Sequence, residues 1–173
     1  MIGKGKSISH GVAALEYDLA KEINGQAVAT EIARHELYGC TGAEMVQEMK
    51  PYHIDFPNVK NNCLRFEVSP SIEESATFTD ADWAELGNDF MQRMGLANHQ
   101  YIIIRHSGTE SKKEQAHLHI LANRVSLSGE LYRDNWIGKK ATEAANAIAK
   151  ERNFVQSQDI GKVNKAEIKE AMD

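Results

Sequence analysis

Two histidines, His117 and His119, stand two residues apart in the apolar stretch AHLHILANRV. The composition of this stretch predicts a β-strand over Ala116–Val125. Side chains two residues apart on a strand leave the same face, so the two imidazoles would lie side by side. Buried imidazoles are costly without a purpose, and neutral imidazole is the commonest metal ligand. The pair therefore indicates either a divalent metal site or two partly exposed histidines at the end of a strand.

A third histidine, His106, ends a second apolar stretch, QYIIIRH. Its β-branched residues predict a strand over Gln100–His106, and the polar residues 107–115 that follow predict a loop. Antiparallel pairing of the two strands across this loop would return His106 toward His117 and His119. Three imidazoles at that place would form a metal site that keeps coordination positions open for water or substrate oxygens.

Tyr17 lies on a helix predicted over His10–Ile23, with Ser9 as its N-cap. The apolar residues of this helix form one stripe: Val12, Leu15, Leu19 and Ile23. At 100° per residue, Tyr17 lies about 150° from the centre of that stripe. The tyrosine is thus either exposed to solvent or part of a cleft. In a cleft beside a metal, its phenol could act as a nucleophile once a base removes its proton.

Further polar side chains are predicted near the histidine pair. Arg65 and Glu67 alternate with apolar residues in CLRFEVS, which predicts a half-buried strand over Cys63–Ser69. Glu67 either belongs to a solvated sheet face or lies beside the histidines as a hydrogen-bonding partner or base. Asn123 shares the face of the histidine pair and either supports that site or ends the ladder. Three residues of segment 107–115 are interpreted as ordinary loop charges: Lys112, Lys113 and Glu114.

The remaining periodic segments complete an α+β pattern. They predict an extended stretch over Ala29–Leu37 and helices over Thr41–Lys50, Thr79–Met94 and Lys139–Arg152. Asn24-Gly25 ends the first helix, Pro51 the second and Gly95 the third, and Thr79 with Asp82 resembles a capping box. Four residues at helical spacing are predicted core: Trp83, Leu86, Phe90 and Met94. Because the strongest strand pair is a hairpin, α+β with an antiparallel sheet is favoured over a doubly wound α/β fold.

The composition excludes several classes of protein. With 173 residues, 42% hydrophobic and 26% charged, the chain has room for one domain and is neither disordered nor fibrous. No apolar run is long enough to span a membrane, and MIGKGKSISHG lacks the apolar core of a signal peptide, so a cytoplasmic protein is expected. Cys40 and Cys63 form no CxxC cluster, which argues against a zinc ribbon and predicts buried, reduced thiols.

The charge balance speaks against nonspecific coating of nucleic acid. There are 20 basic and 25 acidic side chains, which gives a net charge of −5, whereas such coating normally requires a basic excess. A local basic strip can nevertheless bind DNA on an acidic protein. Lys4 and Lys6, spaced by glycines, form one such strip.

The order of these motifs, a tyrosine on an early helix and then H-x-H followed by N-R-V, resembles the plasmid mobilisation relaxases. These are the single-tyrosine mobilisation nucleases of the HUH endonuclease superfamily. Three segments carry the resemblance over roughly residues 1–154: MIGKGKSISHGVAALEYDLAKE, FTDADWAELGNDFMQRMGL and YIIIRHSGTESKKEQAHLHILANRVSLSGE. Gly108 and Gln115 stand where the family often has aspartate and histidine. The general base is left open between Glu67 and Glu114.

The resemblance implies a five-stranded antiparallel sheet flanked by helices, with residues 1–155 as catalytic domain and 156–173 as a polar tail or linker. It implies site- and strand-specific nicking and rejoining of DNA at a plasmid or mobile-element transfer origin through a covalent 5′-phosphotyrosine. Tyr17 would be the nucleophile and Glu67 a catalytic base. A divalent metal, Mg²⁺ or Mn²⁺, would be held by His106, His117 and His119. The DNA-binding residues would be Lys4, Lys6, Ser7, Ser9, Asn123 and Arg124.

The partners implied are single-stranded DNA at the transfer origin, accessory mobilisation proteins and a coupling protein, with no membrane. Two other functions are compatible with the motifs. A rolling-circle replication initiator nuclease shares the H-x-H pair, but its tyrosine normally follows the histidines. A non-catalytic metal-binding accessory module would account for the acidic charge and for Gly108 and Gln115.

Overall fold

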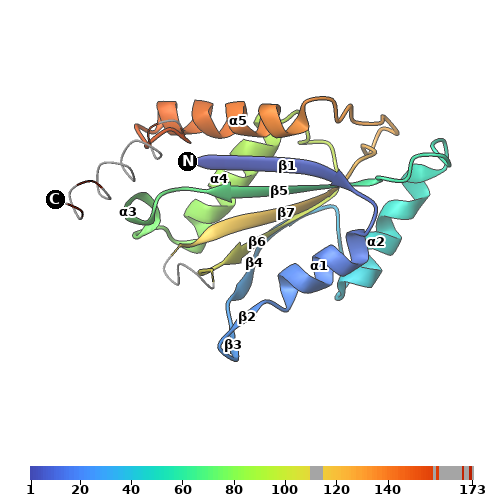
Figure 1. The fold of residues 1–173 in the computed structure, drawn as a ribbon. Helices are drawn as coiled ribbons and strands as arrows, with labels where there is room; N and C mark the ends of the chain where they lie inside the picture. Colours follow the sequence, from blue (N-terminus) through green and yellow to red (C-terminus); the bar gives the residue numbers. More distant parts are fainter. Residues whose placement is uncertain (110–114, 158, 160–168, 170–171, 173) are drawn as a thin grey trace.

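The computed structural model describes residues 1–109, 115–157, 159, 169 and 172. Within these residues the chain forms an α+β fold around an antiparallel sheet of five strands in the order β1-β5-β7-β6-β4 (Figure 1). The strands are β1 (Ile2–Ile8), β4 (Ala29–His35), β5 (Cys63–Ser69), β6 (Tyr101–His106) and β7 (His117–Asn123). The helices are α1 (Gly11–Leu19), α2 (Gly42–Met49), α3 (Ile72–Ser75), α4 (Asp80–Arg93) and α5 (Ile137–Glu151). No helix of the described residues is long and apolar enough to cross a bilayer.

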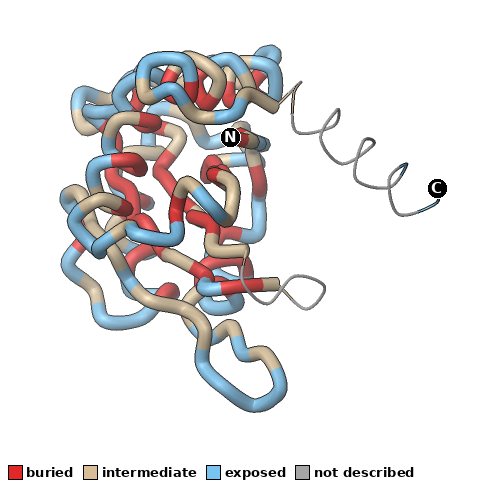
Figure 2. Tube along the Cα trace, turned by 90° about the vertical axis from the view of Figure 1, so that its left-hand side faces the viewer, coloured by how far each residue is buried: buried red, intermediate tan, exposed pale blue. Residues whose placement is uncertain are grey.

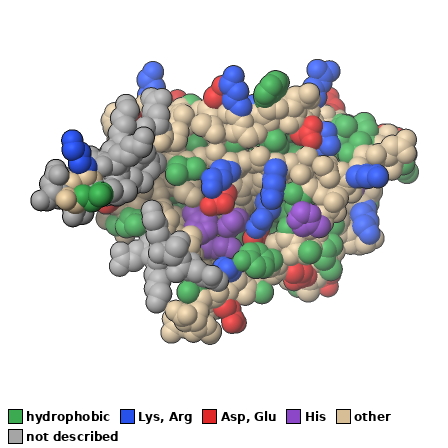
Figure 3. All heavy atoms as spheres, viewed as in Figure 1, with side chains coloured by type: hydrophobic (Ala, Val, Ile, Leu, Met, Phe, Trp, Pro, Cys, Tyr) green, Lys and Arg blue, Asp and Glu red, His purple; other side chains and the backbone are tan. Residues whose placement is uncertain are grey.

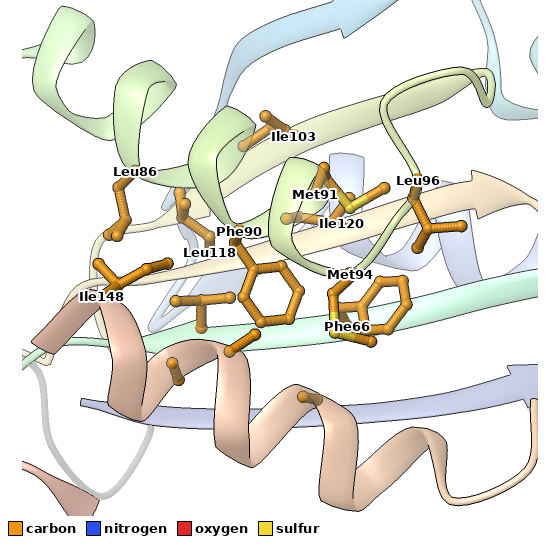
Figure 4. Packing of buried hydrophobic residues seen from close by; sticks show 14 of the residues in the cluster. Phe66, Leu86, Phe90, Met91, Met94, Leu96, Ile103, Leu118, Ile120 and Ile148 are labelled. Atoms are coloured by element: carbon orange, nitrogen blue, oxygen red, sulfur yellow. The ribbon is translucent and has the colours of Figure 1, made fainter.

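Helices cover both faces of this sheet. Phe66, Leu118 and Ile120 pack with α4 and α5 in one core (Figure 4). Ile102, Ile104 and neighbouring strand residues pack with α1 and α2 in a second core. The central strands are therefore buried on both sides, as the burial pattern along the chain shows (Figure 2). Because side chains alternate along a strand, the predicted histidines fall on the α1 and α2 face.

The first strand, β1, is an element that the sequence patterns did not predict. It pairs with β5 so that Lys4 lies opposite Glu67 and Lys6 opposite Arg65. A Cβ on Gly3 would lie 2.3 Å from the carbonyl oxygen of Ala141 in α5. This close approach of α5 requires glycine. The glycines of β1 thus face α5, and its lysines extend from the opposite face of the sheet.

The first helix is shorter than predicted and buries a different face. It begins at Gly11, its N-cap is His10 rather than Ser9, and it ends at Leu19. Its buried residues are Gly11, Ala14, Leu15 and Asp18, whereas Val12 of the predicted stripe is 41% exposed. Beyond the helix, β2 (Glu22–Ile23) and β3 (Gln26–Ala27) form a small hairpin. Asn24 and Gly25 at its turn have positive φ, as a two-residue type I′ turn requires.

Most other sequence expectations are confirmed. The α2 helix has Thr41 as N-cap and is followed by a short 3₁₀ helix over Lys50–His53 that contains Pro51. The capping box of Thr79 and Asp82 begins α4, and the four residues predicted as its core positions are buried. The short α3 was not predicted. Of the two free cysteines, Cys63 is buried as expected, and burial raises the pKa of its thiol to about 11. Cys40 is exposed, which corrects the expectation that both are buried.

The contact between β1 and α5 predicts a stability difference between two glycine variants. Gly3→Ala should lower the free energy of unfolding by about 1–3 kcal/mol, because its methyl group overlaps the α5 backbone. Gly138→Ala is the matched control in the first turn of α5, where the nearest atom lies 3.7 Å from the added Cβ. Urea unfolding should show Gly138→Ala no less stable than the parent protein. Equal stability of all three proteins would contradict this description of the interface.

Candidate metal centre and the adjoining groove

The three predicted histidines meet at one end of the β6–β7 hairpin. His106 pairs with His117 in register, and His119 follows on the same face of β7. One ring nitrogen from each histidine lies within 4.8 Å of the others. Nε2 of His117 is 3.0 Å from Nε2 of His119. The predicted convergence is therefore present, and within the described residues this is the group of side chains that could hold a metal ion.

The environment of His106 and His119 favours neutral imidazoles. His106 and His117 are buried, and His119 is largely buried. Burial lowers the pKa of His119 to about 2, with smaller contributions from His106, His117, Arg65 and Lys21. Burial also lowers the pKa of His106. Neutral imidazoles with free lone pairs are the form that binds a divalent cation.

Hydrogen bonds orient two of the rings. Nδ1 of His117 lies 3.0 Å from the carbonyl oxygen of Gln115. When this nitrogen carries the proton, it donates to that carbonyl, and the lone pair of Nε2 points at His119. Nε2 of His106 donates to the carbonyl oxygen of Asp18 over 2.8 Å. Nδ1 of His106 then carries the lone pair. This orientation of ligands by partners on their other ring nitrogen is typical of metal sites.

Asp18 is a site residue that the sequence analysis missed. Its side chain is 1% exposed, and its two carboxylate oxygens accept from Arg65 Nη2 at 2.5 Å and from Nε at 3.2 Å. One of these oxygens also lies 3.9 Å from His119 Nδ1. The carboxylate thus faces the nitrogen of His119 opposite the one that points at His117. The apolar stripe of the helix gave no signal for this residue, because Asp18 lies on the face of α1 that is buried by contacts with the sheet.

Tyr17 precedes Asp18 on α1, and Asp18 contacts two of the three histidines. At 100° per residue Tyr17 is about 110° from the centre of the buried face of the helix, and it is 56% exposed. Its phenol oxygen accepts from Lys21 Nζ at 2.6 Å. The charge of Lys21 also contributes to the lowered pKa values of His106 and His119. Two neighbours of Tyr17 therefore affect the histidines: Asp18 accepts a hydrogen bond from His106, and the charge of Lys21 lowers the pKa of His106 and His119.

A basic groove adjoins His119. Its open hollow of about 220 Å³ is lined by Lys4, Gly5, Lys6, Arg65, Phe66, Glu67 and His119. The register explains this set, because Lys4 lies opposite Glu67 on β5, and Glu67 lies opposite His119 on β7. Figure 3 shows basic and acidic side chains gathered beside histidines on this face. A groove of this composition can take a phosphate backbone next to the candidate metal centre.

The other predicted residues lie at varied distances from this groove. Glu67 lines it opposite His119, which agrees with the second of its two interpretations, a position beside the histidines. Ser9 is exposed just before α1. Ser7 is half-buried and donates its hydroxyl to Asp134 at 2.7 Å. Glu114, the second candidate base, lies outside the described residues, as do most residues of the predicted tail.

The structure does not bring Asn123 and Arg124 to the groove. Asn123 is fully buried, and its amide donates to the carbonyl oxygen of Met49 and to the side chain of Gln100. Arg124 donates to the carbonyl oxygens of Tyr132 and Asn61. Contrary to the expectation that they bind DNA, both residues hold loops together at the far end of β7. Asn123 ends this strand, as the second interpretation of that residue had it. A buried amide must satisfy its hydrogen bonds internally, so Asn123 has no surface for DNA.

Comparison of the chain with known proteins identified one matching family. The sequence pattern of the relaxases described as MobA/VirD2-like, nuclease domain, matches residues 17–154. The matched span begins at Tyr17 and includes Asp18, Arg65 and the three histidines. No curated protein and no solved structure gave a match.

The contact of Asp18 with His119 predicts an effect on metal affinity. Asp18→Asn should weaken Mn²⁺ binding about 10- to 100-fold, because an amide supports the histidine less well than a carboxylate. Isothermal titration calorimetry measures the affinity, and circular dichroism confirms the fold. Glu22→Gln, an exposed acid beyond the same helix, is the matched control and should leave the affinity unchanged. His119→Ala removes a predicted ligand and should bind no Mn²⁺. Undiminished Mn²⁺ affinity in Asp18→Asn would exclude a role of Asp18 in supporting His119.

Proposed function

The chain belongs to the MobA/VirD2-like relaxases, a family of DNA-nicking nuclease domains that bind single-stranded DNA, and we propose that it nicks and rejoins one strand at the transfer origin of a plasmid or mobile element. The reaction would proceed through a covalent 5′-phosphotyrosine on Tyr17. The observation that carries this proposal is the convergence of three largely buried histidines with a basic groove beside them, where Asp18, the residue after Tyr17, contacts the cluster.

The three histidines would hold one divalent cation. Their donor set fits such an ion, because all three side chains offer a nitrogen within 4.8 Å of the others and their partners leave lone pairs available. A bound cation would stabilise the negative charge that develops on the phosphate oxygens during attack. Nitrogen ligands suit first-row transition ions better than Mg²⁺, which prefers oxygen. Of Mg²⁺ and Mn²⁺, the site therefore favours Mn²⁺.

Tyr17 would be the nucleophile. Its oxygen attacks the phosphorus, a Tyr17 Oη–P bond forms, the bond from phosphorus to the 3′ oxygen breaks, and that oxygen leaves as a 3′ hydroxyl after it gains a proton. The ammonium of Lys21, 2.6 Å from the phenol oxygen, stabilises negative charge there during the attack. Attack by the 3′ hydroxyl on the same phosphorus reverses both bond changes and rejoins the strand. Because the phosphotyrosine conserves the ester bond, rejoining needs no further energy source.

The two carboxylates of the site would have separate tasks. Asp18 is held by Arg65 and faces His119, so it would position a metal ligand. Glu67 lines the groove, and we assign it the role of the base that accepts the phenol proton. Arg65 thus donates hydrogen bonds to the Asp18 carboxylate and also forms part of the groove wall.

The groove would hold the single strand through its phosphates. Lys4, Lys6 and Arg65 supply positive charge along its wall. The partners proposed beyond DNA are accessory mobilisation proteins and a coupling protein, and the proposed location is the cytoplasm. A rolling-circle initiator is less compatible because Tyr17 precedes the histidines by 89 positions or more, from His106 onward. An accessory module without catalysis would form no covalent adduct, which the next experiment examines.

The nucleophile assignment predicts the loss of one covalent product. With Mn²⁺ and a single strand that carries the transfer origin, the parent protein should form a denaturation-resistant adduct linked to the 5′ end of the cleaved fragment. Tyr17→Phe should form none, while its metal and DNA binding persist, because removal of an exposed hydroxyl costs little stability. Tyr38→Phe changes another exposed tyrosine and should retain the adduct. An adduct in Tyr17→Phe would refute the assignment.

The groove predicts a change in the salt dependence of binding. Each lysine that contacts a phosphate of a single strand contributes about 0.7 to the slope of log K against log salt, so replacing Lys4 and Lys6 by alanine should reduce the slope by about 1.4. Fluorescence anisotropy with a labelled oligonucleotide measures this slope. Lys150→Ala is the control, because this exposed lysine lies in the last turn of α5, which covers the face of the sheet opposite the histidines. A slope unaltered by the double substitution would mean that Lys4 and Lys6 are solvated charges only.

A further inference from the structure

Trp136 stands out among the large apolar side chains of the surface. It is 78% exposed, whereas the other tryptophan, Trp83, is 2% exposed in the core. Its backbone is left-handed, with φ 58° and ψ 27°. A bulky residue rarely adopts this conformation, which persists only where the surroundings impose it. Within the described residues, its ring has no aromatic or cation–π partner.

The backbone that carries this ring is anchored on both sides. After it, Lys140 N donates to the carbonyl oxygen of Trp136 at 2.9 Å, which is the first hydrogen bond of α5. Before it, the carbonyl oxygen of Asp134 accepts from Ile137 N at 3.1 Å, and the carboxylate of Asp134 accepts from Ser7 at 2.7 Å and pairs with Arg124. The backbone that carries the exposed ring is therefore held in place before any ligand arrives. Only the side-chain torsions of Trp136 remain to be ordered, so binding costs little conformational entropy.

This anchor connects Trp136 to the groove. Ser7, which binds Asp134, follows Lys6 on β1, and Lys6 lines the groove. The first turn of α5 also approaches β1, because a Cβ on Gly138 would lie 3.7 Å from the carbonyl oxygen of Gly5. Figure 1 shows α5 along β1, which is an edge strand of the sheet. His119 is two strands from this edge, about 10 Å at the usual strand spacing.

The charges around Trp136 suit a nucleic acid. Arg133 and Lys139 are exposed on either side of it, and Lys139 has Glu143 at 3.8 Å as its partner. Asp134 is held by Ser7 and Arg124. Proteins that bind single strands combine a basic track for the phosphates with aromatic rings on which bases stack. Lys4 and Lys6, on the edge strand β1, form such a track. Trp136 is the N-cap of α5, whose first turn approaches that strand.

We propose that Trp136 is a stacking platform for a base of the single strand that the groove holds, a few nucleotides from the phosphate beside the histidines. This rests on the proposed function insofar as the ligand is single-stranded DNA. The contact accepts any base, because every base presents a flat π face. Trp136 would hold the strand over the edge of β1, while Lys4 and Lys6 bind its phosphates.

The test measures DNA binding in the Tyr17→Phe background, where no cleavage interferes. The probes are a mixed-sequence oligonucleotide of 25 nucleotides and an abasic strand of the same length. Trp136→Ala should bind the first probe about 10-fold more weakly with an unchanged salt slope, since base stacking rather than charge is lost. Trp136→Phe should restore most of the affinity. The abasic strand should be bound equally by proteins with and without Trp136.

Fluorescence supplies a second measurement in the unmodified protein. Because Trp83 is buried, iodide should quench mainly Trp136, and the oligonucleotide should protect it from quenching. Equal affinity of Trp136→Ala and its parent for the 25-nucleotide probe, or an equal loss on the abasic strand, would overturn the stacking role. Failure of the proposed function would differ: the parent chain with Tyr17 would form no adduct although Trp136 is protected. An adduct together with an unaffected Trp136→Ala would overturn this inference alone.

Discussion

The buried ion pair between Asp18 and Arg65 is the interaction on which the geometry of the site depends. It joins the last turn of α1 to the middle of β5 with two hydrogen bonds, and the carbonyl oxygen of Asp18 binds His106 at the same place. A carboxylate buried this deeply is costly without its partner, so α1 cannot shift along the sheet without a large loss of stability. Tyr17 is the residue before Asp18, and its position relative to the histidines follows from this pair.

The second constraint is the close packing of β1 beneath α5. The glycines of β1 admit the helix on one face, and the intervening lysines consequently extend on the face of the histidines. The packing of α5 and the proposed contact with DNA therefore both depend on the alternation of glycine and lysine along β1. Trp136 is the N-cap of the same helix, so one element sets both the edge of the groove and the position of the residue that carries the exposed ring.

The acidic net charge does not conflict with a basic groove, because the charges are separated in space. Asp80 and Asp82 lie in the first turn of α4, where they interact favourably with the helix N-terminus, and α4 packs on the face opposite the histidines. Lys4, Lys6 and Arg65 gather beside His119. The local field at the groove is set by these near charges rather than by the sum of −5.

By itself, the sequence determined the features that depend on local periodicity and short-range chemistry. Alternation over Cys63–Ser69, the cap at Thr79 and the two apolar strands around segment 107–115 were sufficient to predict β5, the start of α4 and the meeting of His106 with His117. Only the tertiary structure decided which face of α1 is buried, because Gly11 and Asp18 are buried through their partners on the sheet and carry no apolar signal. For the same reason β1 could not be predicted: glycine has a low strand propensity, and only the packing of α5 explains the glycines of this strand. The burial of Asn123 was equally unpredictable, because its amide is hydrogen-bonded to residues distant in sequence.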